Sequence, residues 1–153
     1  MPATRLSGPG GRVAVVDGLR TPFARIATHY RDYNAIELGE MVVREMMQRN
    51  SLNEADLDQL IYGMTIMIPE APFIAREIAI ACGMDNLDAW SLTRACATSF
   101  QTAASAANNI VNGYSDIIIA GGVDSSSDVR IPMSSKFSSI MRDVAFAKTM
   151  GEG

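Results

Sequence analysis

Short apolar runs alternate along this chain with longer segments in which apolar residues recur every three or four positions. The first run, Val13 to Val16, is apolar and mostly β-branched and is closed by Asp17-Gly18, which predicts a strand buried on both faces and then a turn. Further strands are predicted at Gln59 to Tyr62, which Gly63 ends, at about Ala89 to Thr93, and at Ile117 to Ile119. The last of these is also expected to be buried on both faces.

The segments between the predicted strands carry helix signals. Asn34 and Glu37 form a capping box. The apolar stripe that follows it consists of Leu38, Met41, Val42 and Met46. A second helix is predicted from Pro72 to Gly83, and a third from about Thr98 to Asn112, before Gly113. The third helix has alanine on nearly every side, so we expect it to be buried among close neighbours.

The predicted order of elements is β-α-β-α-β-α-β, which is typical of an α/β fold with helices on both faces of an open, mostly parallel sheet. We expect this domain to occupy residues 1–128. Gly121-Gly122 predicts a tight strand exit rather than a phosphate cradle, because no lysine-bearing loop surrounds it. The pattern weakens in residues 129–153, where Met141 to Met150 looks like the opening of a helical region. We therefore expect 129–153 to be the truncated start of a loop region.

Composition narrows the classes of function. Of the 153 residues, 48% are hydrophobic and 20% are charged, and the formal net charge of −4 comes from interspersed acidic and basic residues. Without a basic face, the chain is not expected to bind nucleic acid. No apolar run approaches the length of a membrane span, and Met1 to Gly11 lacks the apolar core of a secretory signal. We therefore expect a cytoplasmic protein.

The chain has two cysteines, Cys82 and Cys96, which we expect to be free thiols. No metal site is predicted, because there is no Cys-x-x-Cys pair and the only histidine is His29, which we expect to be solvated. Cys96 lies where a strand is expected to pass into a helix, and the unpaired N–H groups of a helix's first turn stabilise a thiolate. From the residues alone, Cys96 is either such an activated thiol or a buried structural one, whereas Cys82 is expected in the core.

Four segments resemble, in the same order, the amino-terminal part of a thiolase of the 3-ketoacyl-CoA type. They are Val13 to Arg25 (VAVVDGLRTPFAR), Pro69 to Met84 (PEAPFIAREIAIACGM), Arg94 to Gln101 (RACATSFQ) and Ala120 to Ser127 (AGGVDSSS). Pro-Glu-Ala-Pro, and the Ala-Thr-Ser after the cysteine, look most like the thiolase subunit of the fatty-acid β-oxidation multienzyme complex. The resemblance implies a three-layer thiolase fold of which this chain holds an incomplete N-terminal half.

The resemblance also implies a role for Cys96 as the nucleophile that takes an acyl group as a thioester, with its backbone N–H contributing to an oxyanion hole. It implies acyl-CoA and CoA as substrates and no separate cofactor; the residues that bind CoA are not identified. The implied protein partners are a second copy of the chain, in a homodimer or higher homo-oligomer, and the hydratase/dehydrogenase subunit of a β-oxidation complex.

The chain departs from the thiolase pattern in its length. The family's activating histidine, second catalytic cysteine and water-holding asparagine have no counterpart here, and neither His29 nor Cys82 is a substitute on the family pattern. We therefore expect a fragment that is inactive, or nearly so, on its own. Two alternatives remain open: a non-catalytic module for dimerisation or complex assembly that keeps the thiolase half-fold, and a related condensing enzyme of the ketoacyl synthase type.

Overall fold

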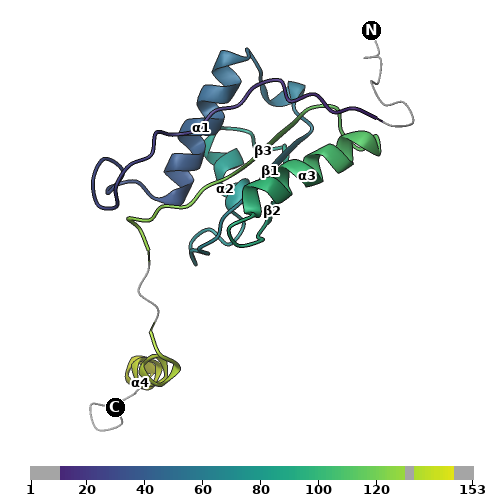
Figure 1. The fold of residues 1–153 in the computed structure, drawn as a ribbon. Coiled ribbons are helices and arrows are strands. Elements are labelled where there is room, and N and C mark those ends of the chain that lie inside the picture. Colours follow the sequence, from purple (N-terminus) through teal and green to yellow (C-terminus); the bar gives the residue numbers. More distant parts are fainter. Residues whose placement is uncertain (1–10, 130–132, 147–153) are drawn as a thin grey trace.

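The computed structural model describes residues 11–129 and 133–146 and shows an α/β arrangement (Figure 1). The elements in chain order are α1 (Ala35–Arg49), the 3₁₀ turn η1 (Glu54–Asp56), β1 (Gln59–Gly63), α2 (Ile74–Ala81), β2 (Asp88–Leu92), α3 (Thr98–Val111), β3 (Ile118–Gly122) and α4 (Ser135–Phe146). The predicted strands at 59–62 and 89–93 and the predicted second and third helices are confirmed, with ends that differ by one or two residues.

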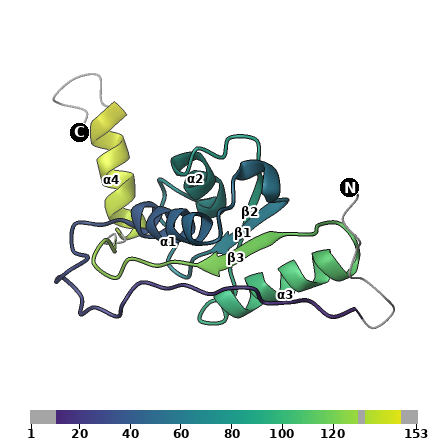
Figure 2. The ribbon, with the colours of Figure 1, turned by 90° about the horizontal axis from the view of Figure 1, so that it is seen from above.

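The three strands form one parallel sheet in the order β2-β1-β3. Gln59 at the start of β1 lies opposite Asp88 of β2 and Ile118 of β3, so all three strands end at the same edge. Helices α1 and α2 cover one face of the sheet and α3 covers the other (Figure 2). The chain steps from β1 out to β2 and then back across β1 to β3, and right-handed crossovers then require α2 and α3 on opposite faces. The predicted parallel sheet with helices on both faces is confirmed.

The main core lies between the sheet and the pair α1 and α2. Side chains alternate along a strand, so Leu60 and Tyr62 enter this core whereas Ile61 lies on the α3 side. Both Leu60 and Ile61 are 0% exposed, and β1 is buried from Leu60 to Gly63 as the central strand. The other core members are Ala35, Val43, Leu57, Met64, Ile68, Ala71, Ile74, Ala75, Ile78, Ala79, Met84 and Leu87. This core fixes the position of β1, and β1 in turn positions the two strands beside it.

Helix α1 begins as predicted. The Glu37 N–H donates to Asn34 Oδ1 at 3.0 Å and the Asn34 N–H donates to Glu37 Oε2 at 2.8 Å, so the capping box is complete. The predicted buried stripe is only partly correct, because Leu38 is buried but Met41 is 41% exposed. Gly39 sits at the contact with α2 instead: a Cβ added there would lie 2.2 Å from Ile78 Cδ1. Close approach at this glycine turns α1 so that Val43, rather than Met41, is buried.

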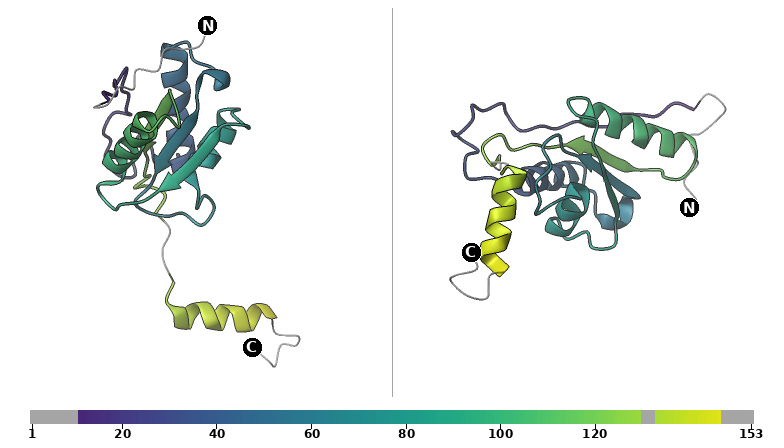
Figure 3. Two further views of the ribbon diagram at one scale, coloured as in Figure 1. Left: turned by 90° about the vertical axis from the view of Figure 1, so that its right-hand side faces the viewer. Right: turned by 90° about the horizontal axis from the view of Figure 1, so that it is seen from below.

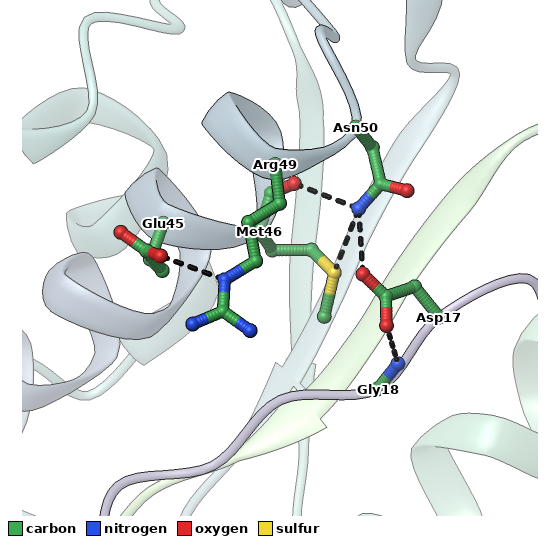
Figure 4. A network of polar contacts seen from close by, with 6 residues as sticks. All are labelled: Asp17, Gly18, Glu45, Met46, Arg49 and Asn50. Carbon is green, nitrogen blue, oxygen red and sulfur yellow. Dashed lines mark hydrogen bonds and ion pairs between the residues drawn. The ribbon is translucent and has the colours of Figure 1, made fainter.

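The predicted strand at Val13 to Val16 is wrong. These residues form an extended stretch outside the sheet, and Val15 and Val16 are 91% and 87% exposed. Strand propensity produces a strand only where the segment pairs with a neighbour, and in the described structure Val13 to Val16 pairs with neither outer strand, β2 or β3. The segment is held instead at Asp17, whose Oδ2 accepts a hydrogen bond of 2.9 Å from Asn50 Nδ2 at the end of α1 (Figure 4).

Two burial predictions near α3 are also wrong. Helix α3 buries Thr98, Thr102 and Ala106, but its outer face is open and Phe100 is 80% exposed. The helix contacts the sheet on one side only, so its alanine-rich composition does not produce burial all round. Ile117 precedes β3 and is 44% exposed, and Ile118 and Ile119 are half-buried. The physical reason is that β3 is the outer strand of the described sheet, with a neighbour on one side alone.

Helix α4 lies apart from the sheet (Figure 3). It begins at Ser135, six residues before the helical opening predicted at Met141, and residues 147–150 of that prediction lie outside the described residues. None of its residues is buried, and Phe137, Ile140, Met141 and Val144 are each about half exposed. No helix in ranges 11–129 and 133–146 combines the length and apolar character that a membrane crossing requires.

Candidate functional site

The candidate site lies at the edge where the three parallel strands end, the edge at which open α/β sheets bind their ligands. The segments that follow β1, β2 and β3 bring Thr65, Cys96 and Asp124 around one hollow of about 150 Å³. The full lining is Gly63, Thr65, Ala95, Cys96, Thr98, Ser99, Gly122, Val123 and Asp124. The thiol singled out by the sequence therefore faces residues from all three strand ends.

Cys96 lies between the end of β2 and the start of α3, as predicted, and its side chain is exposed. The residue before it, Ala95, has φ +48°, a left-handed conformation that is uncommon for a residue with a side chain. The Thr98 hydroxyl accepts the Arg94 N–H at 2.8 Å and donates to the Ala95 carbonyl at 2.7 Å. These bonds close a tight corner, and the closed corner turns the cysteine toward the strand ends.

The first turn of α3 has no side-chain cap. The N-cap residue is Ala97, which has no polar side chain to accept the N–H groups that follow it. Unpaired N–H groups at a helix start attract negative charge, whether a thiolate or a carbonyl oxygen that is becoming an oxyanion. Cys96 precedes this turn by two residues, so the helix presents its positive end beside the thiol.

Two glycines keep the floor of the hollow free of side chains. A Cβ added to Gly63 would lie 2.2 Å from the Leu92 carbonyl oxygen and 2.4 Å from Thr98 Cγ2. A Cβ added to Gly122 would lie 2.5 Å from Ser99 Oγ. The predicted strand exit at Gly121-Gly122 is thus corrected: both residues belong to β3, and glycine is required there by close packing rather than by a turn. Gly121 faces the other way, against the ring of Tyr62.

Thr65 and Asp124 were not identified from the sequence. Asp124 Oδ1 accepts the Thr65 N–H at 2.8 Å and the Ile66 N–H at 2.9 Å, and so joins the segments after β3 and β1. Thr65 Oγ1 in turn donates to the Ala95 carbonyl at 3.2 Å. A usable signal was present, because Asp124 follows the apolar run of a predicted parallel strand and polar residues at such strand ends meet at one edge.

The other candidate residues lie elsewhere. Cys82 ends α2 on the opposite side of the sheet, half-buried and packed against the core, and burial raises the pKa of its thiol. His29 is exposed in a turn and does not line the hollow. In the described part of the chain no three metal-ligating side chains gather in one place. The hollow therefore offers one thiol, one carboxylate, hydroxyls and backbone groups.

Solved structures of two related enzymes share this fold. One is the Bacillus anthracis acetyl-CoA acetyltransferase, with a TM-score of 0.69 and 26% identity, covering 72% of this chain and 28% of that one. The other is the Acat5 thiolase from Ascaris suum in complex with coenzyme A, with a TM-score of 0.72 and 25% identity, covering 76% and 31%. The three-stranded parallel sheet and its helices are thus part of the thiolase fold.

Sequence comparison with curated relatives indicates the same family as the solved structures. A 3-ketoacyl-CoA thiolase of Shewanella halifaxensis is 47% identical over 144 residues, and one of Vibrio cholerae is 49% identical over the same length. Each alignment covers 94% of this chain and 33% of the relative, so the chain spans about a third of the length of the relatives it matches. The family described as thiolase, N-terminal domain, matches residues 13–151. The chain belongs to the thiolase family and corresponds to its N-terminal domain.

Proposed function

We propose that this chain is the part of a 3-ketoacyl-CoA thiolase that carries the acyl-accepting cysteine, Cys96. The supporting observation is the position of that thiol: exposed, beside the uncapped first turn of α3, and lining the hollow at the strand ends. A thiol suits acyl transfer because its thiolate is a strong nucleophile and the thioester it forms stays reactive toward a second thiol.

The proposed reaction has two steps. The Cys96 thiolate attacks the 3-keto carbon of a 3-ketoacyl-CoA, the bond between C2 and C3 breaks, and its electron pair leaves on acetyl-CoA as an enolate that takes up a proton. The thiolate of a second CoA then attacks the thioester, forms the shortened acyl-CoA and releases Cys96 as a thiolate. Backbone N–H groups at the start of α3, including that of Cys96, stabilise the oxyanion in both steps. CoA is a substrate here, and the reaction as written needs no other cofactor.

Groups beyond those lining the hollow must move the protons. The lining includes no histidine, since the single histidine of the chain, His29, lies in an exposed turn. Asp124 is the one carboxylate there, and its Oδ1 is already bound to two backbone N–H groups. We therefore expect residues 1–153 by themselves to give little or no thiolysis, with the acid–base groups supplied by the remaining two thirds of a thiolase.

The proposed setting is cytoplasmic fatty-acid β-oxidation. The proposed partners are acyl-CoA and CoA, a second copy of the chain, and a hydratase/dehydrogenase subunit. Strands β2 and β3 are the outer strands of the described sheet, and strand edges are common sites of association between copies. The same open edges would serve the second candidate function, a non-catalytic assembly module, which needs neither the thiol nor the hollow.

A mass-spectrometric experiment separates the two candidates. The intact protein, as the cell makes it, is incubated with acetoacetyl-CoA, quenched in acid and mapped as peptides. An acetyl group is expected on Cys96 and not on Cys82, and Cys96→Ser should lower kcat by at least about a thousandfold. Cys82→Ser is the matched control, which should retain turnover within about threefold because that thiol lies outside the hollow. Full turnover in Cys96→Ser would refute the acyl-transfer proposal and leave the assembly module.

A further inference from the structure

The carbonyl of Ala95 is the most heavily bonded group in the corner that presents Cys96. It accepts three hydrogen bonds: from the Thr98 N–H at 3.1 Å, from Thr98 Oγ1 at 2.7 Å and from Thr65 Oγ1 at 3.2 Å. Ala95 also carries the left-handed φ of +48°, a conformation that persists only when its surroundings enforce it. The orientation of this peptide group fixes where the next residue, Cys96, begins.

Thr65 and Thr98 both donate to the Ala95 carbonyl, but they come from different parts of the chain. Thr98 belongs to the same corner, two residues after Cys96, whereas Thr65 comes from the segment after β1, 30 residues before Ala95 in the sequence. Its hydroxyl therefore links the cysteine corner to the segment that follows the central strand, in which Leu60 and Ile61 are 0% exposed. The corner is otherwise connected to the sheet through β2, an outer strand, and through the packing of α3.

The position of Thr65 is itself fixed by a hydrogen bond to Asp124, in the segment that follows β3. Asp124 Oδ1 accepts both the Thr65 and the Ile66 N–H groups, and Asp124 directly follows Val123, whose N–H donates to the Gly63 carbonyl at 2.9 Å. The carboxylate thus closes the segment after β1 into a fixed loop. The chain of contacts runs from Asp124 to Thr65, to the Ala95 carbonyl and to Cys96, and all four residues line the same hollow.

We propose that Thr65 and Asp124 are positioning residues for Cys96: they hold its sulfur at the attack geometry through the Ala95 carbonyl, and neither reacts. This inference rests on the proposed role of Cys96 as acyl acceptor. A nucleophile displaced by even about 1 Å loses up to a hundredfold in rate. Positioning residues of this kind should act on the chemical step more than on the affinity for substrate, because their hydrogen bonds run to the Ala95 carbonyl and to the Thr65 and Ile66 N–H groups.

The test is steady-state thiolysis by the intact protein. Thr65→Val keeps the shape of the side chain and removes its hydroxyl, and it should lower kcat about tenfold while KM stays within about twofold. Thr65→Ser restores the hydroxyl and should recover kcat to within about threefold of the wild-type value. Asp124→Ala should lower kcat in the same way, whereas Asp124→Asn, which keeps an acceptor oxygen, should retain most of it. Thr93→Val is the matched control. Thr93 is an exposed threonine in the segment between β2 and α3 that holds Cys96, and it does not line the hollow.

The outcomes distinguish this inference from the proposed function. Unfolding midpoints in urea identify a variant that has simply lost its fold, and Thr65→Ser and Asp124→Asn decide the question if Thr65→Val unfolds. If kcat survives in Thr65→Val, or if KM rises while kcat is unchanged, the positioning role is refuted and the acyl-transfer proposal stands. If Cys96→Ser keeps full turnover in a protein that includes the remaining two thirds of a thiolase, or if the wild-type form of that longer protein has no turnover, both are refuted.

Discussion

At the residue scale, Gly63 is where the central strand, the end of β2 and helix α3 come closest together. A side chain there would meet a backbone oxygen, that of Leu92, at 2.2 Å and the methyl group of Thr98 at 2.4 Å. Backbone cannot swing aside as a flexible side chain can, so the sheet or the helix would have to move. The same helix start presents Cys96, and this glycine therefore determines both packing and site geometry.

Gly63→Ala should destabilise the protein by about 1–3 kcal/mol through overpacking. Gly18→Ala is the matched control, because nothing lies within 4 Å of a Cβ added at Gly18, and it should change the free energy of unfolding by less than about 0.5 kcal/mol. Urea denaturation followed by circular dichroism measures both. Equal midpoints for the two variants would mean that the sheet and α3 are not packed as closely as described.

Tyr62 is buried between the sheet and the helices α1 and α2, and burial, with a smaller contribution from Cys82, raises the pKa of its hydroxyl to about 12. Because the folded state holds the proton more tightly than the unfolded chain, whose tyrosine pKa is near 10, stability is full below pH 10. It falls as the pH rises from 10 toward 12.

Tyr62→Phe removes this titration. Over those two pH units the wild-type protein should lose roughly 2–3 kcal/mol that the variant keeps, because one pKa unit corresponds to about 1.4 kcal/mol. The measurement is the difference in urea midpoint between the two proteins at a series of pH values from about 8 to 11.5. Tyr114→Phe, at a side chain that is 79% exposed, should follow the wild-type curve. Parallel curves for all three proteins would contradict the burial of the hydroxyl.

At the element scale, the sequence correctly predicted features whose signals lie within a few residues. Its predictions were wrong for features that depend on contacts between elements distant in the sequence. The Asn34 capping box and the glycines that end α2 and α3 act within a few residues, and both Gly83 and Gly113 adopt positive φ. Val13 to Val16 has the composition of a buried strand, but a strand forms only where the segment pairs with an edge of the sheet, and this segment pairs with neither β2 nor β3. The rotation of α1 about Gly39 likewise depends on how closely α2 approaches, which no pattern in α1 reveals.

The segment before α1 is anchored by a polar contact rather than by pairing. Asn50, the C-cap of α1, donates to Asp17 Oδ2 at 2.9 Å and to the Met46 carbonyl at 3.0 Å, while the Gly18 N–H donates to the other Asp17 oxygen (Figure 4). The Asn50 and Gly18 bonds, in that order, lower the pKa of the Asp17 carboxyl. The anchor is therefore intact at neutral pH and is lost only in acid, as the carboxylate takes up a proton.

Asn50→Ala should release this segment without unfolding the protein. Limited trypsin digestion at Arg20 and Arg25, both exposed, should become several-fold faster, while the urea midpoint changes little. Asn112→Ala is the matched control, since Asn112 caps α3 through the same bond to the residue four before it, at 2.8 Å, but holds no distant segment. If both variants are cleaved at the same rate as the wild-type protein, Asn50 does not hold the segment.

At the scale of the whole molecule, the candidate site was predicted in part. Cys96 could be found because a strand, a cysteine and a helix follow one another within a few residues. Thr65 and Asp124 are 59 residues apart in the sequence, and they meet because β1 and β3 are neighbours in the order β2-β1-β3. The strand order is a property of the assembled sheet, so no spacing in the sequence could have paired these two residues.

The described residues also include two helices with exposed apolar side chains. Along the outer side of α3 and just past its end, Phe100, Ala104, Val111 and Tyr114 follow helical spacing, and Phe100 and Tyr114 are 80% and 79% exposed. Helix α4 adds a second apolar stripe without any buried residue. Monomeric proteins rarely leave large apolar patches open to water, so we expect both stripes to be contact surfaces.

Residues 1–153, produced alone, should therefore bind the hydrophobic dye ANS and self-associate at micromolar concentrations, because association removes the open stripe from water. Phe100→Ser interrupts the α3 stripe at its most exposed side chain and should lower both the dye fluorescence and the association measured by sedimentation velocity. Phe23→Ser is the matched control: Phe23 is 92% exposed but lies outside both helical stripes, under the Arg20 guanidinium at 4.4 Å from its ring centre, and its loss should change neither signal. A dye-negative, monomeric wild-type chain would show that α3 is covered from within residues 1–153.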